Sequence, residues 1–172
     1  KRVEFEIARS ATTIVRDERG LIPLNISDNG KLLAIVPTAA FSAAKDPSLQ
    51  RGTQGYFLRE HHKNIKSLEV KMNPDFSDLR RAITEAASSE IVVVFTQDPG
   101  ERTGQITLVK KIMDLSKPIV LVPLDVPYDI AEFPEVGTCV VPYGKRECNL
   151  RGLSDVLFGL SDAHGRLPVS IV

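Results

Sequence analysis

The chain has 172 residues, of which 42% are hydrophobic and 26% are charged, a composition typical of one globular domain. Its 22 Lys and Arg residues balance 22 Asp and Glu residues, which argues against a protein that binds nucleic acid through an excess of positive charge. Two cysteines exclude a disulfide-rich scaffold, and no apolar run reaches the roughly 20 residues of a membrane span.

The first half of the chain predicts two helices and two strands. An amphipathic helix is expected from the start to Gly20, because five apolar residues recur at spacings of three and four: Val3, Ile7, Ala11, Ile14 and Val15. The apolar run 32–36 predicts a strand buried on both faces. Residues 37–52 look irregular or weakly helical, and a second helix is expected over 54–63. The alternation over 68–72 predicts a strand at a sheet edge.

The second half alternates strands and helices more regularly. Strands are expected at 91–95, 119–122 and 138–141, and the first of these has the β-branched content of a central strand. Helices are expected from a cap at Asp75 or Ser77 to Ser88, after Gly104, and up to Gly159, followed by an extended tail. Alternation of this kind predicts an α/β protein, a three-layer α/β/α sandwich with a mostly parallel central sheet of five or six strands. Residues 1–172 are expected to form a single domain.

Ligands of parallel sheets bind at the carboxyl ends of the strands, so the residues that follow the strands are the candidates for a site. On this ground Gln97, Asp98, Arg102 and Asp125 are the candidate binding residues. A structural role competes for each carboxylate. The sequence Asp98-Pro99-Gly100 is itself a turn signal, and Asp129, which opens a helical turn, is expected to cap that turn or to pair with its dipole.

Motifs for the common catalytic and cofactor sites are absent from the sequence. It contains no glycine-rich nucleotide loop, no G-x-S-x-G elbow and no H-E-x-x-H, so we assign no catalytic residue, no metal ligand and no cofactor. His61 and His62 are interpreted as part of a solvated helix end, with metal or anion binding as the alternative. Cys139 is interpreted as a core residue, and Cys148, after Lys145-Arg146, as a structural thiol with a reactive one as the alternative.

Three stretches in order resemble a known family: 104–109, 117–130 with its Pro127-Tyr128-Asp129, and 153–159 running into Gly165-Arg166-Leu167-Pro168-Val169. Together they are similar to the C-terminal α/β sandwich domain of family 3 glycoside hydrolases, in particular the β-N-acetylglucosaminidase (β-hexosaminidase-like) branch. The segments 8–17 and 21–24 resemble the start of the same domain, so the likeness covers nearly the whole chain.

The resemblance implies a function for a larger protein. In that family an N-terminal (β/α)8 barrel carries the nucleophilic aspartate, and in this branch the acid/base is a histidine paired with an aspartate on the same barrel. The chain contains neither, and no glutamate, Glu101 included, is assigned to the acid/base position of the β-glucosidase branch. The chain is therefore expected to be an accessory C-terminal domain of a glycosidase, inactive alone, that packs on the absent barrel and edges the sugar cleft.

Other functions and partners stay open at this stage. The main alternative is a stand-alone carbohydrate or small-ligand binding module with a flavodoxin-like sheet, whose ligand would lie over the four candidate residues. The expected partners are the catalytic barrel, with the first helix as one candidate surface for it, and an amino-sugar substrate. A homodimer of the chain is a further hypothesis. The chain begins without Met, so we expect a piece of a longer protein, either cytoplasmic or secreted.

Overall fold

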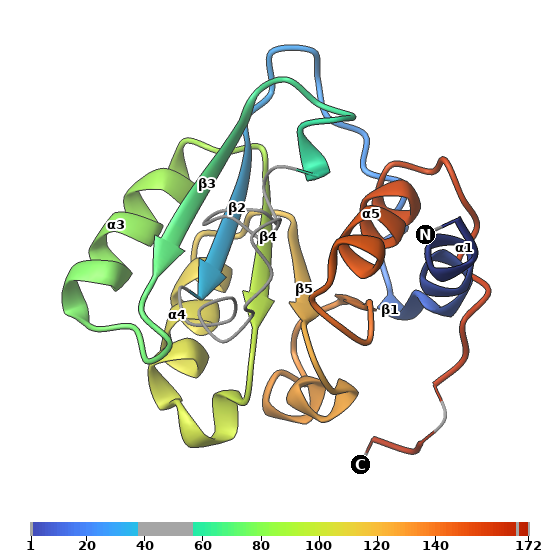
Figure 1. The fold of residues 1–172 in the computed structure, drawn as a ribbon. Coiled ribbons are helices and arrows are strands. Elements are labelled where there is room, and N and C mark those ends of the chain that lie inside the picture. Colours follow the sequence, from blue (N-terminus) through green and yellow to red (C-terminus); the bar gives the residue numbers. More distant parts are fainter. Residues whose placement is uncertain (1, 38–56, 168, 172) are drawn as a thin grey trace.

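The computed structural model describes residues 2–37, 57–167 and 169–171, and within them a six-stranded sheet forms the centre of the fold (Figure 1). The strand order is β1-β6-β5-β4-β2-β3. The strands are β1 (Thr13–Asp17), β2 (Leu32–Pro37), β3 (Ile65–Val70), β4 (Ile91–Thr96), β5 (Ile119–Pro123) and β6 (Thr138–Val141). All neighbours pair in parallel except β1, which runs antiparallel to β6 at one edge. The predicted mostly parallel sheet of five or six strands is confirmed, with six.

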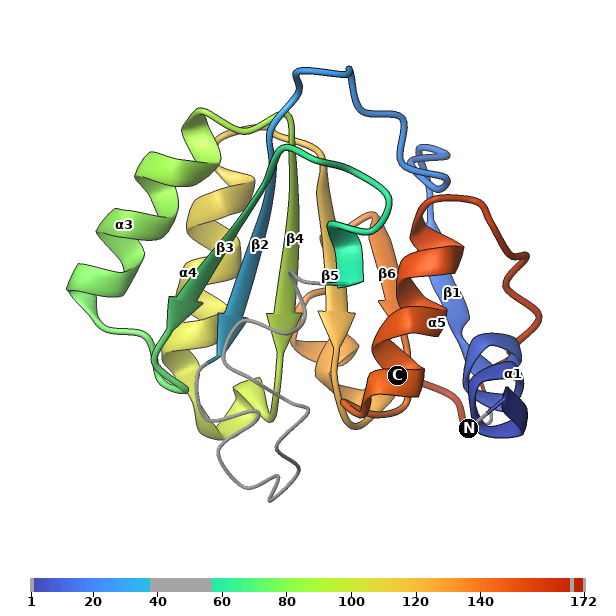
Figure 2. The same ribbon diagram turned by 45° about the horizontal axis from the view of Figure 1, so that its top comes forward.

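Helices cover both faces of the sheet, as the α/β/α prediction requires (Figure 2). Helices α3 (Phe76–Ala87) and α4 (Thr103–Met113) pack on one face, where their apolar side chains join one hydrophobic cluster. Helix α5 (Glu147–Leu157) packs on the other face in a second cluster, and α1 (Arg2–Ala11) packs against α5. Two short 3-10 helices, η2 (Pro99–Glu101) and η3 (Pro127–Glu132), follow β4 and β5.

The burial of the strands explains why they could be predicted. Every residue of β2 and of β4 is buried, because the two faces of these interior strands lie in the two hydrophobic clusters, and such strands are continuous apolar runs. Strand β3 pairs on one side only and alternates buried and exposed positions, as predicted for an edge strand, although it begins three residues earlier than expected. Asp75 caps α3 as expected, since its carboxylate accepts hydrogen bonds from the backbone amides of Ser77 and Asp78 at 2.9 and 3.1 Å.

The predicted extension of the first helix toward Gly20 is wrong. The helix ends at Ala11, and Thr13–Asp17 form strand β1. The segment contains β-branched residues, which suit a strand, and it finds a partner in β6, which lies more than 120 residues away in the chain. The guanidinium group of Arg16 holds the strand in place by donating hydrogen bonds to the carbonyl oxygens of Pro134 and Val136 at 2.8 and 2.7 Å.

The first helix packs through small residues and leaves part of its apolar stripe exposed. Ala8 is 6% exposed and lies against Gly152 of α5, where a Cβ atom would come within 2.8 Å of the Cα atom of Arg9. In contrast, Val3 and Ile7 are 70% and 64% exposed. The part of the stripe that lies on the helix, at Val3 and Ile7, therefore does not face the core of this domain.

Two expectations fall partly outside the described residues. Of the helix expected over 54–63, only the part from Phe57 on can be compared, and there Phe57 and Leu58 are helical and buried before the chain turns. The irregular segment expected over 37–52 lies outside the described residues after Pro37. At the other end, α5 closes at Leu157, and Gly159 adopts the expected left-handed conformation with φ of 72°.

Candidate functional site

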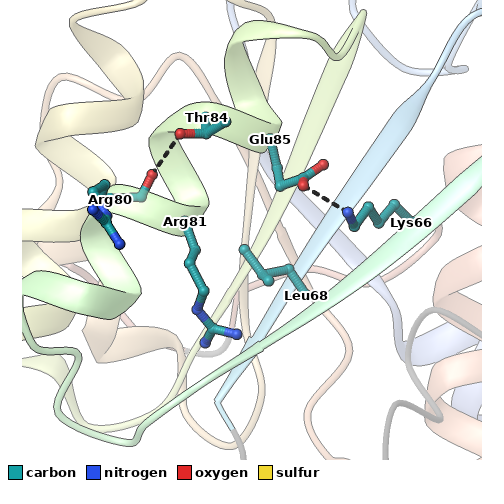
Figure 3. A pocket seen from close by; sticks show the side chains of 6 residues that line it. All are labelled: Lys66, Leu68, Arg80, Arg81, Thr84 and Glu85. Carbon is teal, nitrogen blue, oxygen red and sulfur yellow. Dashed lines mark hydrogen bonds and ion pairs between the residues drawn. The ribbon is translucent and has the colours of Figure 1, made fainter.

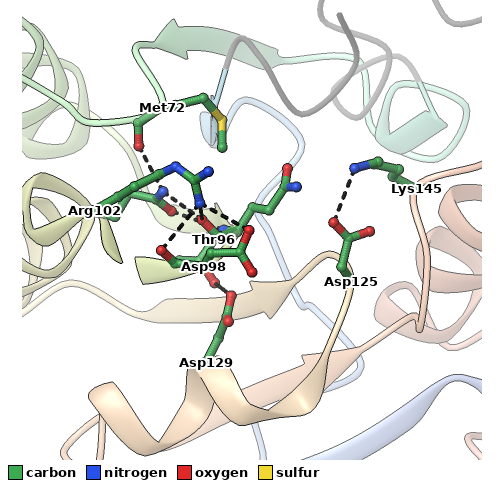
Figure 4. Close-up of polar contacts among 9 residues, drawn as sticks. Met72, Thr96, Asp98, Arg102, Asp125, Asp129 and Lys145 are labelled. Atoms are coloured by element: carbon green, nitrogen blue, oxygen red, sulfur yellow. Dashed lines mark hydrogen bonds and ion pairs between the residues drawn. The ribbon is translucent and has the colours of Figure 1, made fainter. Parts of the chain in front are cut away.

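The carboxyl ends of β4, β5 and β6 meet at one edge of the sheet, since these strands are parallel. The connections that follow β4 and β5 carry all four predicted binding residues. Gln97, Asp98 and Arg102 lie in the connection between β4 and α4, and Asp125 follows β5. Figure 4 shows these connections side by side. The structure therefore brings the four predicted residues to the same edge.

Asp98 and Arg102 form an ion pair that closes the turn after β4. The guanidinium Nη1 atom of Arg102 lies 3.0 Å from Oδ2 of Asp98 and also contacts the backbone carbonyl oxygens of Gln97 and Asp98 at 3.3 and 3.4 Å. Asp98 itself is left-handed, with φ of 47° and ψ of 55°. Because a non-glycine residue pays a conformational cost there, the contacts around it have to maintain that conformation. The turn predicted for Asp98-Pro99-Gly100 is confirmed.

Gln105 holds the same turn from the side of α4. Its side chain is 2% exposed, and its Oε1 atom accepts the backbone amide of Gln97 at 3.0 Å while its Nε2 atom donates to the carbonyl of Gln97 at 2.9 Å. Nε2 also donates to the carbonyl of Met72 at 2.8 Å, so one buried amide joins the connections that follow β3 and β4. The sequence analysis did not single out this residue as part of a site, since one glutamine near the start of a helix carries no pattern.

Asp129 is buried beneath this turn, and its predicted capping role is wrong. Val126 occupies the cap position of η3, and no side chain caps that helix. The carboxylate of Asp129 is instead directed at β4, where its Oδ2 atom accepts a hydrogen bond from the buried hydroxyl of Thr96 at 3.0 Å (Figure 4). Burial, with the nearby charges of Asp98 and Asp125 in support, raises the pKa of Asp129 from 3.8 to about 6.

Asp125 pairs with a cation from the loop after β6. The Nζ atom of Lys145 lies 3.1 Å from Oδ2 of Asp125, and both side chains are about one-third exposed or less. This pair and the pair of Asp98 with Arg102 lie on either side of the edge in Figure 4. Two polar atoms at the same edge, Oε1 of Gln97 and the hydroxyl of Tyr143, are buried and have no hydrogen-bond partner among the described residues. The edge is thus polar, ion-paired and not fully satisfied by its own groups.

The other residues named from the sequence have structural environments. His61 lies 3.3 Å from Asp155 on α5 and stacks at a tilt on Phe158, and the Nε2 atom of His62 lies 2.7 Å from the carbonyl oxygen of Gly30. The predicted solvated helix end is therefore wrong for these two histidines, because both make contacts within the fold. Among the described residues, no three His, Cys, Asp or Glu side chains gather as a metal site would require.

The two cysteines differ in their surroundings. Cys139 is fully buried in β6, as predicted for a core residue, and burial raises the pKa of its thiol to about 11. Cys148 is half-buried near the start of α5, with its Sγ atom 3.7 Å from the side-chain oxygen of Asn149.

A surface groove lies away from this edge, between β3 and α3 (Figure 3). It is lined by Lys66, Leu68, Arg80, Arg81, Thr84 and Glu85. Most of the charged side chains that line the groove form ion pairs with other residues of the domain. Glu85 accepts from Lys66 at 2.6 Å and from Lys31 at 2.7 Å, and Arg81 pairs with Asp78 at 2.8 Å. The pair of Glu85 with Lys66, and a hydrogen bond from Arg81 to the carbonyl oxygen of Glu69 at 2.9 Å, hold the edge strand to the helix, so the groove is not the first candidate for a site.

No protein-family model matches the sequence, and no curated protein matches it either. Solved structures do match the fold. A fungal multi-domain GH3 β-N-acetylglucosaminidase superposes on 97% of this chain with a TM-score of 0.80 and 22% identity, and a glycoside hydrolase family 3 β-N-acetylglucosaminidase from Paenibacillus sp. str. FPU-7 superposes on 95% with a TM-score of 0.80 and 19% identity. A β-glucosidase from Listeria innocua superposes on 92% with a TM-score of 0.73 and 17% identity.

This chain has the fold of one domain of the family 3 glycoside hydrolases. It spans only 18%, 31% and 25% of the three enzyme chains, so in each of them this domain is part of a larger protein. The fold expected from the resemblance is confirmed. None of the helices formed by the described residues of the domain has the length and hydrophobicity that crossing a bilayer requires.

Proposed function

We propose that the chain is the accessory C-terminal domain of a family 3 glycoside hydrolase of the β-N-acetylglucosaminidase type, and that catalysis takes place on a barrel that precedes it. The observation that carries this proposal is the match of nearly the whole chain to less than a third of two β-N-acetylglucosaminidases. A domain that repeats one part of such enzymes is expected to have the role of that part. The substrate class would be terminal β-linked N-acetylglucosamine.

The chemistry of the strand-end edge supports a role without bond cleavage. Most glycosidases use two carboxyl groups that flank the scissile bond, one of which donates a proton. Asp98 and Asp125 are each held by a cation, Arg102 at 3.0 Å and Lys145 at 3.1 Å, so neither carboxylate is free to flank a glycosidic bond. Asp129 is only 5% exposed, and Thr96 is bonded to it, so a sugar cannot reach it without a rearrangement of the loops. We therefore assign no catalytic residue to this domain.

The exposed stripe of α1 supports contact with a further domain. Val3 and Ile7 lie one helical turn apart and are 70% and 64% exposed, while the opposite side of the helix is fixed on α5. Exposed apolar side chains that group on one face are candidates for an interaction surface. In the proposed arrangement the barrel precedes the domain in the chain, so α1 is the element beside the connection, and the barrel is the partner that covers it.

Enzyme assays test this proposal directly. The longer protein that contains the chain is expected to hydrolyse an aryl N-acetyl-β-glucosaminide, and the 172-residue chain alone is expected to be inactive. Failure of the longer protein on this substrate would rule out the proposed activity, and turnover by the chain alone would rule out an accessory role.

The packing of α1 has its own test. Charged replacements at Val3 and Ile7 (Val3→Lys with Ile7→Lys) are expected to lower the thermal stability of the longer protein more than that of the chain. Thr107→Lys, an exposed position on α4 across the sheet, is the matched control. Equal effects in the longer protein and in the chain would contradict packing of the barrel on this helix.

A second candidate function is direct contact with the sugar at Gln97, Asp98, Arg102 and Asp125. The observation in its favour is the buried Oε1 atom of Gln97, which lacks a hydrogen-bond partner among the described residues and could accept from a hydroxyl or N-acetyl group. Calorimetry of the chain with N-acetylglucosamine distinguishes the two roles. Saturable binding that Gln97→Leu abolishes would favour a binding module, and absence of heat would leave the packing role alone.

A further inference from the structure

The backbone at the end of β4 is held from two sides by buried polar side chains. From α4, Gln105 bonds both the amide and the carbonyl of Gln97. From η3, the carboxylate of Asp129 accepts a hydrogen bond from the hydroxyl of Thr96 at 3.0 Å. Thr96 and Gln97, the two residues that lead into Asp98, are therefore held by side chains that come from other elements.

The hydrogen bond between Thr96 and Asp129 holds the chain two residues before Asp98, the residue whose backbone conformation is unfavourable. A left-handed conformation costs a residue other than glycine of order 1 kcal/mol, and Asp98 keeps it with φ of 47°. The ion pair between Asp98 and Arg102 depends on this conformation, because both partners lie in the same turn, four residues apart. Asp129 comes from a different strand connection, 33 residues from Thr96 in the chain, so it adds a restraint that the turn cannot supply.

The burial of a carboxyl group at this place is itself unfavourable. Asp129 is 5% exposed. Two other carboxylates, Asp98 after β4 and Asp125 after β5, repel its negative charge. Their charges are balanced by Arg102 and Lys145 at 3.0 and 3.1 Å. An apolar residue would pack here without this cost. We therefore attribute the presence of the carboxylate to its hydrogen bond with Thr96 and not to packing.

We propose that Asp129 is a positioning residue, whose carboxylate fixes the end of β4 and thereby sets where Gln97, Asp98 and Arg102 stand at the edge of the sheet. Asp129 acts through Thr96 and touches no ligand itself. The consequence for a ligand rests on the second candidate function, direct contact of this turn with the sugar, while the effect on the turn does not.

Hydrogen–deuterium exchange of the longer protein that contains the chain tests the proposal on the turn. Asp129→Ala is expected to speed exchange of the peptide covering 97–102 by about tenfold, because the restraint on Asp98 is lost. Asp129→Asn keeps one acceptor oxygen and is expected to lie between the alanine variant and the wild type. Peptides of α1 serve as an internal reference, and Asp114→Ala, an exposed carboxyl at the end of α4, is the matched control variant.

A pH series separates positioning from general packing. In the wild type the exchange of 97–102, after correction for the intrinsic rate, is expected to change between pH 5 and 7 as the carboxyl group of Asp129 titrates, and in Asp129→Asn this change is expected to vanish. Unchanged exchange in Asp129→Ala, equal acceleration in the alanine and asparagine variants, or the same pH dependence in wild type and Asp129→Asn would each overturn the proposal.

Kinetics of the longer protein extend the test to the ligand. Asp129→Ala is expected to raise KM for the aryl N-acetyl-β-glucosaminide by about threefold to tenfold with kcat within about twofold, because the turn holds the substrate and does not react with it. Faster exchange with an unchanged KM would overturn the link to the ligand. Absence of activity in the wild type would refute the proposed function. The positioning role of Asp129 on the turn would then be tested by the exchange results alone.

Discussion

Gly152 on α5 is the position where a single methyl group has the clearest consequence. A Cβ atom there would lie 2.8 Å from the Cα atom and 2.9 Å from the backbone nitrogen of Arg9, well inside the 3.4 Å at which ordinary van der Waals contact begins. The neighbouring atoms belong to the backbone of α1, so no side chain can rotate away. Gly152→Ala is therefore expected to push α1 away from α5.

Two effects of Gly152→Ala oppose each other, and their sizes decide the outcome. Alanine in place of glycine in a helix gains about 1 kcal/mol, while overpacking of a close contact costs about 1–3 kcal/mol. Because the contact is with backbone, we expect the upper part of this range and a net loss of about 2 kcal/mol. In a domain of this size the loss corresponds to a fall in Tm of roughly 5 °C.

Thermal unfolding and hydrogen exchange measure the two parts of this prediction. The Tm of Gly152→Ala should be lower than that of the wild type. Relative to the wild type, amide exchange in the variant should speed up more in α1 than in α3. Thr84→Ala and Thr84→Gly, at an exposed position of α3, give the helical preference for alanine over glycine in this protein as a control. A Gly152→Ala variant as stable as the wild type, or more stable, would refute the close packing of α1 on α5.

Three further predictions concern pH and polar contacts. The pKa of Asp129 rises from 3.8 in the unfolded chain to about 6 in the folded one. The free energy of unfolding should therefore fall by up to about 3 kcal/mol as pH rises from about 4 to 7. Denaturant unfolding at several pH values should show that Asp129→Asn lacks this fall. Glu85, whose pKa Lys31 and Lys66 lower from 4.5 to about 2, should contribute stability above pH 4.5 that is lost toward pH 2 and reduced by salt, and Glu85→Gln should show neither dependence in the same titration. Gln105→Leu should cost about 2–4 kcal/mol in urea unfolding, because it leaves buried backbone groups of Gln97 unpaired; a loss below 1 kcal/mol would contradict the role of that amide.

The candidate site shows how far a sequence can locate polar residues. The rule that parallel strands end at one edge was sufficient to bring Gln97, Asp98, Arg102 and Asp125 together. The groups that hold them come from elsewhere in the chain, such as Lys145, which pairs with Asp125 across 20 residues. No local pattern marks a pair of this kind, because it depends on how two loops end beside each other.

What the sequence determined by itself is the set of elements whose signal is local. The interior strands β2, β4 and β5 are apolar runs that only a sheet covered on both faces can bury, and Asp75 caps α3 through contacts within three residues. What only the tertiary structure decided are the features set by distant partners. Residues 13–17 continue the helical spacing of α1, yet they form β1, because pairing with β6 satisfies their backbone groups along an open sheet edge. The burial of Asp129 under the turn after β4 is of the same kind, since its partners follow from the packing of strand ends and not from its neighbours in the chain.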